Sequence, residues 1–137
     1  MNQDDLKRRT KQFSLRVMKL VGALPGTFQG RAIASQLVRA GTAVGANYRA
    51  SCRARSHAEF IAKIGIVEEE SDECCFWLEL IIEASLLKAK LVQPLLQEAN
   101  ELVAIMSASR KSAKNRRAMN GRAKPQSAIA NRQSAIP

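Results

Sequence analysis

The sequence predicts an all-α protein, an antiparallel up-down-up-down four-helix bundle that is followed by a disordered basic C-terminal tail. Good helix formers dominate the composition and aromatic residues make up only 4%, so signals for β-strands are nearly absent. Apolar residues recur at spacings of three and four along several segments, which is typical of helices that bury one face. We therefore expect a bundle domain in residues 1–112 and a low-complexity tail in residues 113–137.

The first helix is expected from about Asp4 to Leu24. Asp4 and Asp5 fall in its first turn, where the helix dipole favours carboxylates. Pro25 and Gly26 end the helix, because proline lacks a backbone donor and glycine tolerates positive φ. Its apolar stripe consists of Leu6, Phe13, Val17, Leu20 and Leu24.

The second helix is expected from Arg31 to Cys52. Gly41 and Gly45 suit close packing against a neighbouring helix, although glycine lowers helix propensity. The apolar stripe consists of Ile33, Leu37, Ala40, Val44 and Tyr48. The opposite face carries a ridge of arginines, namely Arg31, Arg39, Arg49 and Arg53.

The longest helix is expected from Ser56 to Leu91. Ser56 and Glu59 form a capping box, in which each side chain accepts the backbone N–H of the other residue. A stripe for the bundle core consists of Phe60, Ile64, Val67, Ser71, Cys74, Leu78, Ile81 and Ser85. A second stripe consists of Trp77, Leu80, Ala84, Leu87 and Leu91. Two apolar faces indicate either a central position in the bundle or a contact with another subunit.

A fourth helix is expected to begin at Pro94, which suits the first helical position, and to end between Ser107 and Lys114. Its core stripe consists of Leu95, Ala99, Leu102, Val103 and Met106. After it the apolar pattern stops, and an imperfect seven-residue repeat indicates disorder. Such a basic tail either binds RNA or DNA weakly or has no function.

The charge is distributed in three blocks. Residues 1–65 carry a net charge of +9, residues 66–106 carry −7 and residues 107–137 carry +8. This asymmetry indicates either an anionic partner, with nucleic acid the first choice, or helices of opposite charge that neutralise one another. The candidate nucleic-acid-binding residues are Arg31, Arg39, Arg49, Arg53, Lys7 and Lys11.

Catalytic chemistry has little support in the sequence. A single histidine, His57, excludes a di-iron bundle site, and the chain contains no phosphate-binding or nucleophile motif. The acidic run Glu68–Glu73 can in principle hold Mg²⁺, but ion pairing with arginines of the same or a neighbouring subunit is the simpler explanation. We therefore expect no enzyme, no metal and no cofactor. The candidate subunit-interface residues are Glu69, Glu73, Trp77, Leu80 and Leu87.

The three cysteines, Cys52, Cys74 and Cys75, are odd in number and have no C-x-x-C spacing. They are expected to be buried structural thiols in a reducing compartment. The sequence contains no apolar run long enough for a membrane span and no apolar leader at its start. A cytoplasmic location without membrane contact is therefore expected.

One connected pattern of residues extends over the second and third helices: Gln36–Ala40, Gly45–Ala50, Arg53, Arg55-Ser56, Glu59-Phe60, Lys63–Gly65, Glu68-Glu69, Asp72-Glu73 and Trp77–Leu80. It resembles the bacterial four helix bundle protein family, which includes proteins encoded by intervening sequences of 23S rRNA genes. The accessory variability proteins of diversity-generating retroelements are similar. The resemblance covers roughly residues 6–110.

The resemblance implies an antiparallel four-helix bundle that assembles into a barrel-like homopentamer. It also implies a basic surface for nucleic acid, no catalytic residues and, in retroelement members, partnership with a reverse transcriptase. Two functions follow as expectations. The first is a non-catalytic oligomeric protein that binds the backbone of RNA or DNA through its basic surface. The alternative is a protein-interaction scaffold, such as an accessory subunit of a reverse transcriptase, without direct nucleic-acid binding.

Overall fold

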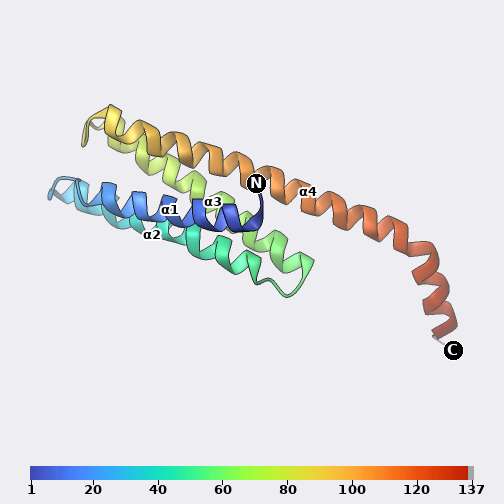
Figure 1. Cartoon of the computed structure of the whole chain (residues 1–137). Coiled ribbons are helices and arrows are strands. Elements are labelled where there is room, and N and C mark those ends of the chain that lie inside the picture. The colour runs from blue at the N-terminus through green and yellow to red at the C-terminus, as the bar shows by residue number, and fades with distance from the viewer. Residues whose placement is uncertain (136–137) are drawn as a thin grey trace.

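The computed structural model describes the backbone of residues 1–135 and the side chains of residues 1–121. It contains four helices: α1 (Gln3–Val21), α2 (Phe28–Cys52), α3 (His57–Glu83) and α4 (Ala89–Ala135). Successive helices run antiparallel, and α1 also lies beside α4, although more loosely than the other neighbours pack (Figure 1). Short connections enforce this order, because a helix that follows a tight turn must return along its predecessor. The expected all-α four-helix architecture is confirmed.

The core lies between the inward faces of all four helices. The sequence-derived stripes supply it, and its largest fully buried side chains include Phe13, Leu37, Ile64, Leu78 and Leu102. Three polar residues among the described side chains are also buried. Thr10 and Ser71 donate their hydroxyls to carbonyls one turn earlier, each over 2.7 Å, and Ser51 donates to the Tyr48 carbonyl over 2.6 Å. Every buried side-chain nitrogen and oxygen in the described part of the chain has a hydrogen-bond partner.

The first turn of α2 begins earlier than the sequence pattern indicated. The N-cap is Thr27, whose hydroxyl accepts the backbone N–H of Gly30 over 3.1 Å. A Cβ at Gly30 would lie 2.1 Å from the carbonyl oxygen of Pro25, so this tight turn requires glycine. The cap therefore draws residues 28–30 into the helix.

The start of α3 confirms half of the expected capping box. Ser56 is the N-cap and accepts the N–H of Glu59 over 3.0 Å. The Glu59 carboxylate accepts the N–H of Arg55 over 3.2 Å rather than that of the cap residue. The turn thereby gains a hydrogen bond one residue before the helix.

The end of α3 corrects the sequence analysis, because the helix stops at Glu83 and not at Leu91. Ser85 adopts φ 55°, and its N–H and that of Leu86 donate to the carbonyls of Ile82 and Ile81, each over 3.0 Å. This is a Schellman termination, formed here with serine in the left-handed position where glycine is usual. The sequence lacked the glycine that marks such an end.

This early end divides the second apolar stripe between two helices. Trp77 and Leu80 lie on α3, Leu87 lies in the following turn, and Leu91 lies on α4. The expected start of the fourth helix at Pro94 is also wrong. Because α3 ends early, α4 can begin at Ala89, and Val92 is already fully buried. Pro94 therefore lies in the second turn, where its missing N–H costs one helical hydrogen bond.

The helix α4 leaves the bundle after Ala113, the last buried residue whose side chain is described. Residues 114–121 are all exposed, and the helical backbone continues to Ala135 away from the bundle (Figure 1). The expected end of the fourth helix between Ser107 and Lys114 is therefore wrong, because good helix formers continue the helical backbone past the last core contact. The final residues of the expected tail, 136–137, lie outside the described residues.

Candidate functional site

The seam between α1 and α2 is closely packed through glycine. A Cβ at Gly41 would lie 2.6 Å from Val17, and a Cβ at Gly45 would lie 2.7 Å from the Ser14 hydroxyl. The Ser14 Oγ donates to the Gly41 carbonyl over 2.7 Å and so links a side chain of α1 to the backbone of α2. Small residues at this four-residue spacing let helix backbones approach one another, as the sequence pattern predicted.

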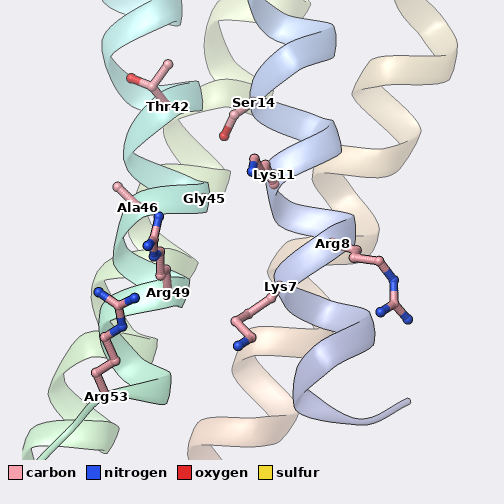
Figure 2. Close-up of a pocket in the computed structure, with 9 residues that line it drawn as sticks. All are labelled: Lys7, Arg8, Lys11, Ser14, Thr42, Gly45, Ala46, Arg49 and Arg53. Carbon is pink, nitrogen blue, oxygen red and sulfur yellow. The ribbon is translucent and has the colours of Figure 1, made fainter.

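A groove of about 530 Å³ follows the outer side of this seam. It is lined by Lys7, Arg8, Lys11, Ser14, Thr42, Gly45, Ala46, Arg49 and Arg53. Figure 2 shows Lys7 and Lys11 on α1 opposite Arg49 and Arg53 on α2, whereas Arg8 points away from the groove. The structure therefore brings together four of the six residues that the sequence proposed for nucleic-acid binding. We call these four residues the groove cations.

The groove contains almost no compensating negative charge. The chain has no aspartate or glutamate between Asp5 and Glu59, so the α2 wall supplies no acid and the α1 wall supplies only Asp4 and Asp5 in its first turn. Asp5 pairs with Arg8 at 2.5 Å. Lys7 lies 3.6 Å from the highly exposed Asp4 carboxylate, a contact that solvent weakens. Among the described residues, Lys11, Arg49 and Arg53 form no ion pair.

The spacing of the groove cations suits an anion with several charges. Lys7 and Lys11 are four residues apart on α1, and Arg49 and Arg53 are four residues apart on α2. Each pair is therefore separated by about 6 Å along its helix axis. Two antiparallel rows of positive charge that repel one another are stabilised when a polyanion lies between them.

The other three helix seams are bridged by ion pairs. Arg39 of α2 reaches Glu70 over 2.9 Å and also pairs with Glu73, both on α3. Arg9 of α1 pairs with Glu98 at 2.7 Å and with Glu101 at 2.9 Å, both on α4. Across the seam of α3 and α4, the bridge joins Arg110 and Glu68 at 2.8 Å.

These bridges have a clear electrostatic consequence. Hydrogen bonding to the facing carboxylates raises the pKa of the Arg9 and Arg39 guanidinium groups above their ordinary value. The pKa of Arg110 is raised for the same reason. Each of the three arginines is therefore held by the fold itself, in contrast to the groove cations.

Two proposed nucleic-acid residues lie outside the groove. Arg39 is directed toward α3, where its guanidinium pairs with two carboxylates. Arg31 lies at the other end of α2, where its guanidinium donates to the Gly26 carbonyl over 2.6 Å. The arginine ridge of the sequence analysis is therefore divided among three positions with different neighbours.

Four of the proposed subunit-interface residues follow one another along one side of α3, namely Glu69, Glu73, Trp77 and Leu80, and Leu87 lies in the turn after this helix. Glu73 accepts hydrogen bonds from Arg39 and from the Trp77 indole N–H, the latter over 3.2 Å. Trp77 and Leu87 are half-buried and pack against the core of their own chain. Leu80 is also half-buried, whereas Glu69 is exposed.

Sequence reasoning missed Phe76 on the outer side of α3. Its side chain is 52% exposed and meets the edge of Trp77 with ring centroids 5.0 Å apart. The sequence could have indicated this residue, because Phe76 lies outside both apolar stripes and a large aromatic residue on a polar face is unusual.

Two of the three cysteines are buried, as the sequence predicted. Cys74 and Cys75 are buried, and Cys52 is half-buried. Burial raises the pKa of the Cys75 thiol to about 11, and its Sγ lies 3.4 Å from the Asn100 side-chain oxygen. Burial likewise raises the pKa of Cys74. A buried thiol with a raised pKa is a poor nucleophile.

No group of three or more histidine, cysteine, aspartate or glutamate side chains within the described part of the chain is arranged to hold a metal ion. The single histidine, His57, instead makes a 2.7 Å hydrogen bond with the Ala113 carbonyl. No helix in the described part of the chain has the length and apolar content that a bilayer crossing requires.

Comparisons with known proteins agree with this architecture. A family model described as 23S rRNA-intervening sequence protein matches residues 3–108. The chain is also similar to a solved structure from Bacteroides thetaiotaomicron, a protein of unknown function from the S23 ribosomal protein family. That similarity has a TM-score of 0.73 at 27% identity and covers 77% of this chain and 98% of the other. No curated protein matches the chain. Neither description names an enzymatic activity.

Proposed function

The chain belongs to the 23S rRNA-intervening sequence protein family, and from this premise we propose that it is a non-catalytic protein that binds the phosphate backbone of nucleic acid. The binding surface is the groove between α1 and α2. One observation carries the proposal: this seam has cations on both sides without a facing acid, whereas an arginine and glutamate bridge each of the other three.

The chemistry of the groove favours the backbone over the bases. Its lining contains lysines, arginines, hydroxyls and small residues, and it contains no aromatic side chain on which a base could stack. Gly45 and Ala46 add no long side chain to the lining, which leaves room for a phosphate between the cations. We therefore expect little sequence preference and an affinity that falls steeply with salt.

The test compares arginines of the same helix. The double variant Arg49→Ala/Arg53→Ala should weaken the binding of mixed-sequence RNA and DNA oligonucleotides, measured by fluorescence anisotropy at several salt concentrations. For single strands the slope of log affinity against log salt should decrease by about 1.4, since two phosphate contacts are lost.

The control is Arg39→Ala, which removes a cation that α3 already neutralises. It should leave the salt slope close to that of the unmodified protein. If the unmodified protein shows no binding to either nucleic acid at low salt, the proposed function is wrong.

A second candidate function is a scaffold that assembles with copies of itself. The exposed Phe76 beside the half-buried Trp77 favours it, because large aromatic side chains that remain accessible are common interface anchors. The family resemblance favours a homopentamer, and partnership with a reverse transcriptase belongs to this candidate. Native mass spectrometry of the Phe76→Ser variant tests it, since an unchanged assembly would remove this face from the interface. The three free thiols favour a reducing, cytoplasmic setting for either function.

A further inference from the structure

The side of α4 that faces the core becomes basic where the helix leaves the bundle. Ala113 is fully buried, and Arg116 and Arg117 follow it by three and four residues. These spacings place both arginines on the same side of the helix as Ala113. Both side chains are exposed, because the bundle has ended at this level. The side that packs apolar residues inside the bundle therefore presents two cations beyond it.

Two contacts hold α4 at the point where it leaves. The His57 ring, in the first turn of α3, bonds to the Ala113 carbonyl over 2.7 Å. One turn earlier, Arg110 pairs with Glu68 of α3 at 2.8 Å. The extension therefore starts from a fixed position beside the turn that joins α2 to α3.

The extension leaves from the end of the bundle at which the groove opens. Figure 1 shows α4 passing the turn between α2 and α3, which is also the end at which α1 begins. Arg53 closes α2 at this end, and Arg55 lies in the adjoining turn. The helices pack in ring order, so the core side of α4 looks across the bundle toward α2. Past the bundle, that side faces the space into which the groove leads.

We propose that the extension of α4 is a second arm of the same binding surface, so that one nucleic-acid strand runs from the groove, past Arg53 and Arg55, to Arg116 and Arg117. This inference rests on the proposed function of the groove. The charge of this segment supports the inference. The chain has no aspartate or glutamate after Glu101, so its positive charge complements that of a phosphate backbone.

The length of the required strand follows from the ion pairs between α1 and α4. Arg9 meets Glu98 and Glu101, so Lys11 lies near the level of residue 98 on α4. From that level to Arg117 the helix rises about 28 Å. A stacked strand with about 3.4 Å per nucleotide needs roughly eight nucleotides to cover this distance. A five-nucleotide strand can occupy the groove without reaching the extension.

The experiment uses the full chain and single-stranded RNA probes of 5 and 20 nucleotides. The variant Arg116→Ala/Arg117→Ala should weaken binding of the 20-nucleotide probe by about 5-fold to 10-fold at low salt and reduce its salt slope by about 1.4. Binding of the 5-nucleotide probe should stay within about 2-fold. A control with the same change in net charge is Lys88→Ala/Lys90→Ala. Both lysines are exposed and lie in or just after the turn between α3 and α4, at the end of the bundle opposite the extension.

The outcomes separate the two proposals. If Arg49→Ala/Arg53→Ala weakens both probes while Arg116→Ala/Arg117→Ala behaves like its control, the second arm is wrong and the groove stands. If the groove variant binds both probes with unchanged affinity, the proposed function is wrong. If only the extension variant then loses affinity, the continuous surface is wrong as well. Loss of 20-nucleotide binding in both variants, with the 5-nucleotide probe sensitive only to the groove, supports the inference.

Discussion

The helix α2 presents arginines to two seams, and the charge of the facing helix differs between them. On the α3 side, Arg39 meets two glutamates and is fixed by ion pairs. On the α1 side, Arg49 and Arg53 face lysines across a groove without an acid. The same residue type on one helix therefore stabilises the fold in one seam and creates a positive potential in the other. The role of a surface arginine is decided by what the facing helix supplies.

The two seams also differ in what holds them together. The seam of α1 and α2 relies on close backbone approach at Gly41 and Gly45, with a hydrogen bond from Ser14. The seam of α2 and α3 adds charged side chains that reach from one helix to the other. Close packing in the first seam brings like charges together, so its stability and its proposed binding function are in tension.

The largest expected effect comes from breaking the glycine seam. Gly41→Ala places a Cβ against the branched side chain of Val17, which cannot move away easily, and should destabilise the protein by about 1–3 kcal/mol. The control is Gly65→Ala in α3, where the Cβ would meet only the Arg110 Cδ at 3.7 Å. This control should raise stability by up to about 1 kcal/mol through helix propensity. Urea unfolding measures the stability of both variants, and equal changes in stability would contradict close packing at Gly41.

A smaller effect should follow when one cation is removed from each type of seam. Arg9→Ala leaves Glu98 and Glu101 facing one another without their shared partner and should cost about 1 kcal/mol. Arg49→Ala removes a charge that has only like charges opposite and should leave stability unchanged or slightly higher. Thermal unfolding at low salt compares the two variants. A larger loss for Arg49→Ala would show that this arginine has a stabilising partner.

The smallest expected effect comes from turning the acid-bridged seam into a cationic one. Glu70→Gln/Glu73→Gln releases Arg39, which should raise RNA affinity about 3-fold at low salt and increase the salt slope by about 0.7. The control Glu79→Gln/Glu83→Gln makes the same change in net charge at two exposed positions of α3. Filter binding across a salt series measures both. If the two variants gain equally, overall charge and not the released arginine explains the increase.

Much of the fold was readable because helix periodicity is local. The apolar stripes of all four helices became the core, that of α3 as far as Ile81. Ser56 caps α3, and Gly41 and Gly45 allow the close packing that the sequence predicted. The end of α3 was misplaced because Ser85 adopts a left-handed conformation. Glycine usually occupies this position at a helix end, so serine gave no signal in the sequence. Because no stop signal was visible at Ser85, the helical spacing of Leu87 and Leu91 was read as a continuation of the same helix.

The sequence by itself determined four helices, their core faces and a segment between Asp5 and Glu59 without acidic residues. It could not determine which arginine meets which carboxylate, because pairs such as Arg9 and Glu98 are 89 residues apart and form only when the bundle closes. Only the tertiary structure separated Arg39 from Arg49 and Arg53 and joined the latter to Lys7 and Lys11 in one groove. The physical reason is that periodicity fixes the direction of a side chain on its own helix, whereas packing decides what that side chain meets.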